Sequence, residues 1–140
     1  MKANAFVAFG GLVVVACGGG ADPPSDVFPS AAYESVTSSS GAYAIEVRTS
    51  PQPPRVGVGS VELRIRDRGG VVVDGLTFVV IPVMPAHAHG ASVRPTVSTK
   101  GDGTYVLENV STYMPGQWEL RTTIQGVNVS DDATIPLDVR

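Results

Sequence analysis

The stretch that decides the fold is "VGVGSVELRIRD", residues 56–67, in which apolar and charged side chains alternate. Val61, Leu63 and Ile65 fall on one face of an extended chain, and the residues between and after them are charged. This period of two is typical of a β-strand with one face buried and the other in water. No credible amphipathic helix occurs elsewhere, so the stretch points to an all-β fold.

Other short strands are predicted on both sides of this stretch, separated by turns rich in Gly, Pro, Ser and Asn. They cover residues 43–49, 76–84, 91–99, 104–110, 116–124 and 133–139. The run "LTFVVIPVM", residues 76–84, is almost wholly apolar, which predicts a central strand buried on both faces or one that bends at Pro82. Pro95 predicts that residues 91–99 form an edge strand. We therefore expect an immunoglobulin-like β-sandwich of about seven antiparallel strands, with an up-and-down barrel as the alternative.

The first residues have the features of an export signal. Lys2 precedes an apolar run from Ala5 to Ala16, which has the length of a signal-peptide core and is too short for a comfortable membrane span. The run ends in "VVAC", which resembles a bacterial lipobox with Cys17 as the lipidated residue. Cys17 is the only cysteine, so no intramolecular disulfide can use it. The alternative is an ordinary signal peptide that happens to contain a cysteine.

A chain of 140 residues fits one folded domain. We expect a lipoprotein signal peptide at residues 1–16, a lipidated Cys17 with a flexible Gly/Pro/Ser-rich tether at 17–41, and the sandwich domain at 42–140. Gly18, rather than Asp, follows the cysteine, which indicates the outer membrane if the host has one. The predicted location is therefore the cell envelope, with the membrane as a partner through Cys17. The net charge of −3 and the scattered arginines exclude the basic face of a nucleic-acid-binding protein.

Both histidines and both internal methionines occur in two short segments, "MPAHAHG" at residues 84–90 and "YMPGQW" at residues 113–118. The first segment ends the third predicted main strand, and the second precedes the sixth. These two strands are antiparallel neighbours in an immunoglobulin-like sandwich, so the segments should converge at one end. His87 and His89 are two residues apart and point the same way if that segment is extended.

Imidazole and thioether groups together suit Cu(I), or Cu(II) with mainly nitrogen ligands. The candidate metal ligands are Met84, His87, His89 and Met114. Tyr113 and Trp118 would shield the ion. The predicted function is copper binding, storage or delivery to another envelope protein, with no enzymatic activity because no catalytic constellation is present.

Each of these residues also has an ordinary explanation. Met84 and Met114 could be core packing, and the two histidines could lie in a solvated connector. The domain would then have a structural or protein-interaction role without a metal. A zinc site would need a carboxylate such as Asp102, and the spacing matches no strong zinc pattern. A copper–zinc superoxide dismutase needs more histidines than the two in this chain.

The order of the motifs resembles the YtkA-like domain family, which is related to the FixH-type proteins. The shared features are a Met-Pro-x-His-x-His-Gly step at residues 84–90, a Gly-x-Tyr strand start at 103–105 and a Met-x-Gly-x-Trp strand start at 114–118. The resemblance covers about residues 54–125. It implies an extracytoplasmic sandwich domain, and the link of some relatives to copper handling for respiratory oxidases favours copper. The lipobox-like start differs from the transmembrane helix of the FixH type, which puts a role in oxidase assembly in doubt.

Overall fold

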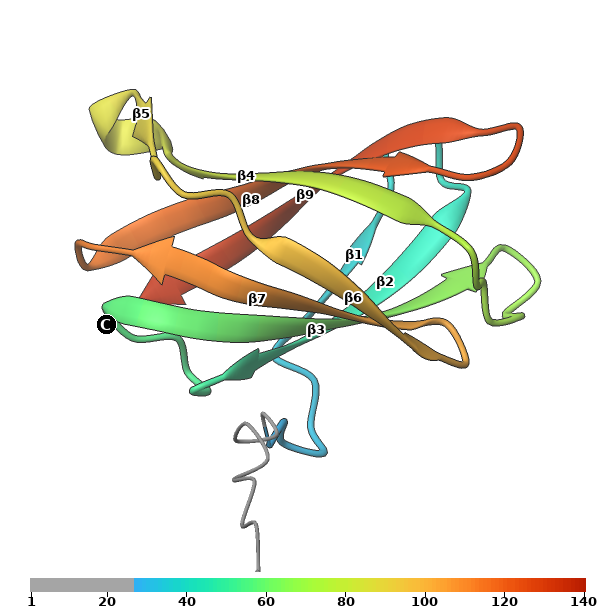
Figure 1. Cartoon of the computed structure of the whole chain (residues 1–140), viewed down its shortest axis with the longest axis horizontal. Coiled ribbons are helices and arrows are strands. Elements are labelled where there is room, and N and C mark those ends of the chain that lie inside the picture. The colour runs from blue at the N-terminus through green and yellow to red at the C-terminus, as the bar shows by residue number, and fades with distance from the viewer. Residues whose placement is uncertain (1–26) are drawn as a thin grey trace, which may run out of the picture.

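The computed structural model describes residues 27–140, which form two antiparallel sheets packed face to face (Figure 1). The signal segment, Cys17 and the predicted tether up to residue 26 lie outside the described residues. The first sheet contains, in spatial order, β1 (Glu34–Thr37), β2 (Tyr43–Ser50), β3 (Gly57–Asp67), β7 (Thr104–Thr112) and β6 (Thr96–Gly101). The second contains β5 (His89–Gly90), β4 (Thr77–Met84), β8 (Gly116–Gln125) and β9 (Ser130–Val139).

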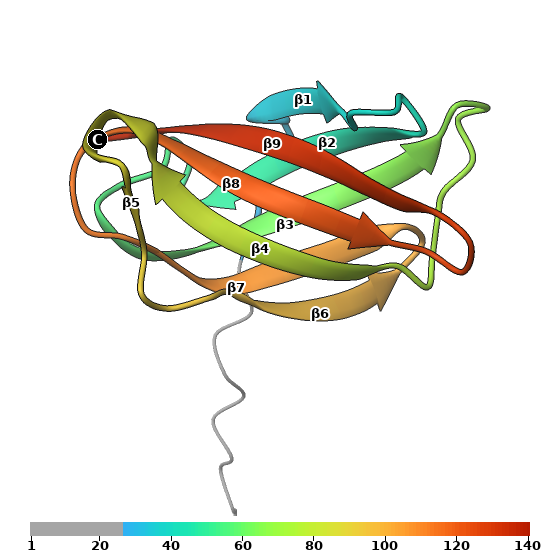
Figure 2. The same cartoon turned by 90° about the horizontal axis from the view of Figure 1, so that it is seen from above.

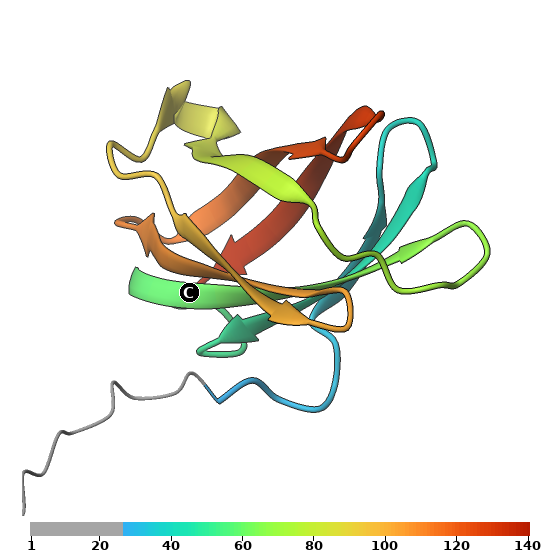
Figure 3. The same ribbon diagram turned by 45° about the vertical axis from the view of Figure 1, so that its right-hand side comes forward.

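The strand order confirms the predicted sandwich. Without the short strands β1 and β5, the order is β2-β3-β7-β6 over β4-β8-β9, which is the arrangement of a constant-type immunoglobulin domain. Figure 2 looks onto the second sheet, and Figure 3 shows the two sheets as separate layers. Within residues 27–140 no helix is long and apolar enough to cross a membrane.

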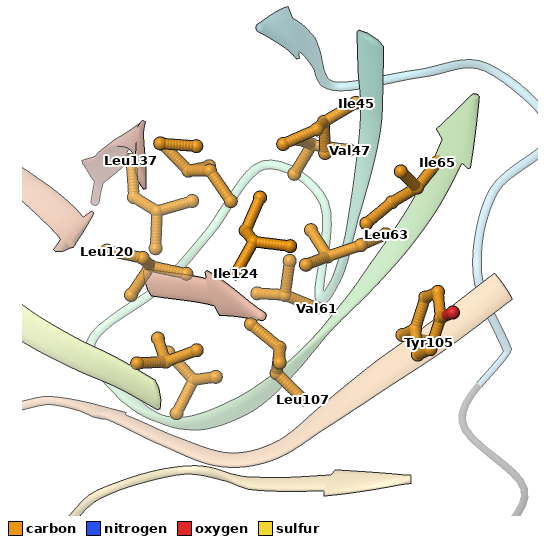
Figure 4. Packing of buried hydrophobic residues seen from close by; sticks show 14 of the residues in the cluster. Ile45, Val47, Val61, Leu63, Ile65, Tyr105, Leu107, Leu120, Ile124 and Leu137 are labelled. Atoms are coloured by element: carbon orange, nitrogen blue, oxygen red, sulfur yellow. The ribbon is translucent and has the colours of Figure 1, made fainter. Parts of the chain in front are cut away.

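The alternating side chains of β3 form one wall of the core, as the sequence predicts. Val61, Leu63 and Ile65 are almost completely buried, and Leu120 and Ile124 of β8 face them from the second sheet (Figure 4). Burying each such side chain stabilises the fold by about 1.5–3 kcal/mol. This contact between the layers fixes which face of β8 points inward.

The prediction that residues 76–84 form a strand buried on both faces is wrong. β4 pairs along its length with β8, whereas β5 covers only its last two residues. Val79 and Ile81 therefore lie exposed on the outer face of the second sheet. β4 continues through Pro82 without a break, and the Pro82 carbonyl accepts a hydrogen bond from the Ala91 N–H at 3.0 Å. The predicted edge position is confirmed, because β6 lies at the edge of its sheet, but the strand begins directly after Pro95 and not at residue 91.

The prediction of a flexible tether is wrong for residues 27–41. β1 pairs with β2, from Glu34 opposite Val47 to Thr37 opposite Ala44. Val36 is the only apolar residue of β1 and packs against the core, so the strand has no repeated hydrophobic period by which the sequence could predict it.

Polar contacts fix the segment that precedes β1. The Arg48 Nε and Nη2 atoms donate to the Ser30 carbonyl at 3.3 and 3.1 Å. The Tyr33 N–H donates to the Val47 carbonyl at 2.7 Å, and the Tyr33 hydroxyl accepts from the Asp138 N–H at 2.8 Å. The folded domain therefore begins well before residue 42.

Asp131 on β9 holds the turn between β1 and β2. Its buried carboxylate accepts hydrogen bonds from the Ser40 N–H at 3.0 Å, the Ser40 hydroxyl at 2.6 Å and the Asp132 N–H at 2.9 Å. Burial raises the pKa of Asp131, but hydrogen bonds from Ser38, Ser40 and Asp132 outweigh this effect and lower the pKa to about 2.

This lowered pKa makes the fold sensitive to acid. The pKa of the carboxyl falls from 3.8 in the unfolded chain to about 2 in the folded chain. The ionised group therefore stabilises the fold above about pH 4, and the contribution disappears as the pH falls towards 2. We expect Asp131→Asn to lower the free energy of unfolding by about 2 kcal/mol at pH 7 and by little at pH 2.

Urea unfolding at several pH values measures this difference. The matched control is Asp102→Asn, because Asp102 is exposed and its left-handed backbone (φ 51°) suits asparagine. Equal destabilisation by Asp131→Asn at pH 7 and pH 2 would contradict the assignment.

Candidate metal site

The segment 84–90 forms a tight reversal at the end of β4. After Met84 the chain makes one 3-10 turn, η1 (Pro85–His87), and Ala88 then adopts a left-handed backbone with φ 52°. β5 returns antiparallel to β4, with His89 opposite Met84. Gly90 is required here because a Cβ at this position would lie 2.9 Å from the Pro82 carbonyl oxygen.

The segment 113–118 forms the connection between β7 and β8. The Trp118 indole Nε1 donates to the Met114 carbonyl at 2.9 Å, which fixes the turn against the buried start of β8. Gly116 has φ 128°, and a Cβ there would lie 2.7 Å from the Met84 Cε atom. The glycine thus leaves the space that the Met84 methyl group occupies, and this contact joins the two segments.

The predicted convergence of the two segments is confirmed. The Tyr113 hydroxyl lies 2.7 Å from His89 Nδ1, and the rings of these residues stack with their centroids 5.7 Å apart. The His87 ring also stacks with His89, with centroids 5.6 Å apart, and Trp118 meets Tyr113 edge-on at 5.1 Å. Four rings therefore run from the exposed histidines to the buried tryptophan, at the end of the sandwich that carries η1 and β5 (Figure 1).

The two histidines are adjacent for a reason other than the predicted one. The sequence suggests an extended segment, in which residues two apart point the same way. In the structure His87 ends the 3-10 turn and His89 begins β5, with left-handed Ala88 between them. The reversal at Ala88 brings the rings into a stack at an angle of 26°. Both side chains remain exposed.

The methionines lie deeper than the histidines. Met84 is only 4 % exposed and belongs to the hydrophobic core, as the core-packing alternative predicts. Met114 is half-buried and packs against the same core. The candidate ligands thus form an exposed imidazole pair above two thioethers that also serve as packing.

The zinc alternative is not supported by the described residues. Asp102 lies in the turn before β7, whereas Tyr113 directly follows the end of β7, so the full length of that strand separates Asp102 from the histidines. Within residues 27–140 no three His, Cys, Asp or Glu side chains are grouped so that they could hold a metal ion. Any metal at the histidine pair would therefore need thioether, phenol or backbone donors from this part of the chain.

Tyr113 can select the nitrogen that His89 presents to a metal. The Tyr113 hydroxyl also lies 3.5 Å from the Gly90 carbonyl oxygen, which can only accept a hydrogen bond. When the hydroxyl donates to Gly90, it must accept from His89, and Nδ1 then carries the imidazole proton. The Nε2 atom keeps its lone pair in that arrangement. A fixed hydrogen bond to the other ring nitrogen is the usual support of a metal-binding histidine.

Two structural roles were missed in the sequence. Gly116 forms the contact surface for Met84, and Ala88 makes the left-handed reversal between the histidines. The role of Gly116 could have been predicted from the Met-Pro-Gly order, because glycine at a strand start often marks the close approach of another group. Nothing in the sequence signals a positive φ at an alanine.

The YtkA-like family model matches residues 37–123, from the end of β1 into β8. The chain belongs to the YtkA-like family. Both segments of the candidate metal site lie inside the region shared with the YtkA-like family. No curated protein and no solved structure matches the chain.

The burial of Met84 gives a test of its packing role. We expect Met84→Ala to lower the free energy of unfolding by about 2–5 kcal/mol, because it leaves a cavity beside Gly116. Met84→Leu, which keeps the volume, should cost less than about 1.5 kcal/mol. Met114→Ala should cost less than Met84→Ala because Met114 is only half-buried. Urea unfolding of the three variants measures these costs, and a negligible loss for Met84→Ala would exclude a packing role.

Proposed function

We propose that this YtkA-like domain binds copper at the end of the sandwich where the histidine pair meets Tyr113, and that it stores or delivers the ion in the cell envelope. The observation that carries the proposal is the convergence of the two Met-Pro segments, with His89 Nδ1 held 2.7 Å from the Tyr113 hydroxyl. Two imidazoles are already adjacent there, so ordering the first two ligands costs little entropy.

The available donors favour copper over harder metals. Carboxylates, which Mg²⁺ and Ca²⁺ require, are not grouped with the histidines in residues 27–140. The remaining candidates are the imidazoles of His87 and His89 and the thioethers of Met84 and Met114, which suit Cu(I). Such a set would give the ion a site at the protein surface, from which another protein can accept it.

Met84 can reach this site from its place in the core. It is the direct β-sheet partner of His89, and paired residues have Cα atoms only about 4.5–5.5 Å apart. The methionine side chain is unbranched and flexible, so its sulfur can turn without moving the backbone. Coordination by Met84 would nevertheless withdraw it from contacts in the core.

The rival function is a structural or protein-interaction domain without a metal. The burial of Met84 favours it, because a core methionine needs no further explanation. The exposed histidines and the half-exposed Tyr113 would then form part of a contact surface. The histidines bind a metal ion under the first function and contact a protein partner under the second.

Titration with Cu(I) against a competing chelator separates the two functions. The protein would start at Gly18, which keeps every described residue and removes the thiol of Cys17 as a competing ligand. We expect one ion to bind per chain and to quench the fluorescence of Trp118, which lies at the inner end of the row of rings. The double variant His87→Ala/His89→Ala should weaken binding by more than about 100-fold. Unaltered binding by that variant would contradict the proposed site.

Two further variants test the hydrogen bond to His89 and control for effects far from the site. Tyr113→Phe keeps the ring but removes the hydrogen bond to His89, and it should weaken binding by about 10–100-fold with little loss of stability. Gln125→Ala, at the far end of β8, is the matched control and should bind as the parent does. Absence of Cu(I) binding in the parent protein would leave the interaction domain as the function.

We propose in addition that Cys17 anchors the domain to a membrane through lipid. The support is the lipobox-like "VVAC" at residues 14–17 and the lack of a second cysteine. Acyl chains bind a membrane by burying many methylene groups, each contributing about 0.8 kcal/mol. We expect the wild-type chain, expressed in a bacterial host, to sediment with the membranes and Cys17→Ser to remain in the soluble envelope fraction. Equal fractionation of both proteins would exclude the anchor.

A further inference from the structure

The end of the sandwich opposite the histidine pair carries two exposed apolar loop tips. The loop between β3 and β4 contains "GGVV", residues 69–72, and the loop between β8 and β9 contains "GVNV", residues 126–129. Neither tip contains a charged residue. The valine tips are Val71, Val72, Val127 and Val129, which are 60, 39, 95 and 46 % exposed.

Both loops project from the same end of the molecule. Figures 1 and 2 show them beyond the ends of the strands, whereas η1 and β5 lie at the other end. The two tips belong to separate loops, one between β3 and β4 and the other between β8 and β9. Projecting apolar side chains of this kind fit a deformable medium better than a rigid partner surface.

Hydrogen bonds hold both loops in place. The Gly126 N–H donates to the Val129 carbonyl at 2.8 Å, which closes the second tip. The Asp67 N–H donates to the Val71 carbonyl at 2.8 Å, and the Asp67 carboxylate accepts from the Val71 N–H at 3.0 Å. The buried Tyr105 hydroxyl donates to the Val73 carbonyl at 2.8 Å. Because the loops are already ordered, little conformational entropy is lost when the tips are buried.

The charges at this end are compatible with a lipid surface. The carboxylates of Asp67, Asp74 and Asp131 lie behind the tips, and each accepts hydrogen bonds from backbone N–H groups. Arg66 and Arg68 are exposed, and their guanidinium groups donate to backbone carbonyls of the same end. These three carboxylates outnumber the two guanidinium groups, so the contact with lipid rests on the apolar area of the tips rather than on charge.

We propose that the valine tips insert into the interface of the lipid bilayer to which the chain is anchored. The inference rests on the proposed anchor, because the anchor supplies the bilayer. Val27 follows Cys17 by about ten residues, which reach at most about 35 Å when extended. An eight-residue strand such as β2 spans only about 26 Å. The anchored domain can therefore turn its tips to the membrane, with the histidine pair directed away from it towards a partner in solution.

Fluorescence quenching by brominated lipid tests this orientation. A chain from Cys17 to Arg140 would be coupled through its single thiol to a maleimide phospholipid, in vesicles of phosphatidylethanolamine and phosphatidylglycerol with brominated acyl chains. This coupling does not depend on lipidation in the cell. Val127→Trp places a probe on one tip, and Val58→Trp is the matched control, because Val58 is exposed at the end that carries the histidines. Trp118 is present in both proteins and provides a common background.

We expect the Val127→Trp emission to shift to the blue and to be quenched, and the Val58→Trp emission to remain as in vesicles without bromine. Adding Val71→Asp and Val129→Asp to the Val127→Trp chain should abolish the quenching, while circular dichroism confirms the fold. Equal quenching of both probes, or none in either, would overturn the proposal. The copper titration is done without vesicles, so its outcome is independent of this one.

Discussion

The pairing of β4 with β8 is the constraint on which the rest of the site depends. Its register runs from Thr77 opposite Gln125 to Val83 opposite Glu119. This register leaves the end of β4 beside the start of β8, so the chain that follows Met84 and the chain that precedes Trp118 must share one end of the sandwich. The core contact of β8 with β3 keeps the inward face of β8 fixed, and the register cannot slip by one residue without exposing it.

The same architecture gives the two ends of the sandwich different chemistry. At one end, turns rich in aromatic and imidazole groups carry side chains that can donate to a metal or a hydrogen bond. At the other, short loops carry valines supported by hydrogen-bonded carboxylates. Between the two ends, Arg48 holds the segment before β1 against the first sheet through the Ser30 carbonyl. The Glu62 carboxylate accepts a hydrogen bond from the Arg48 guanidinium group at 3.3 Å. A domain that is bound to a surface at one end and exchanges a ligand at the other needs this kind of asymmetry.

The sequence predicts the parts of the fold that depend on hydrophobic period and strand count. The alternation at Val61, Leu63 and Ile65 predicts β3 and the face it buries, and the order of the strands predicts the convergence of the two Met-Pro segments. The apolar run of β4 is misleading, because hydrophobicity alone does not say whether a second layer covers Val79 and Ile81.

Other features depend on individual torsions and contacts, which carry no period. β1 is held by pairing with β2, the segment before it is held by Arg48, and the histidine stack depends on the left-handed Ala88. The hydrogen bond between Tyr113 and His89 depends on two side-chain rotamers. The strand order in the sequence predicts which segments meet, whereas the atoms that meet depend on these torsions and rotamers.

The position of Met84 connects the stability of the domain to its proposed function. Its methyl group occupies the space left by Gly116, so the thioether contributes to the core when no ion is bound. Coordination would exchange some of these packing contacts for a bond to copper, and the loss would reduce the net affinity. An ion bound through Met84 would consequently be held less tightly than by four exposed ligands of the same kind. For a protein that passes copper to a partner, this is an advantage, because release restores the core packing.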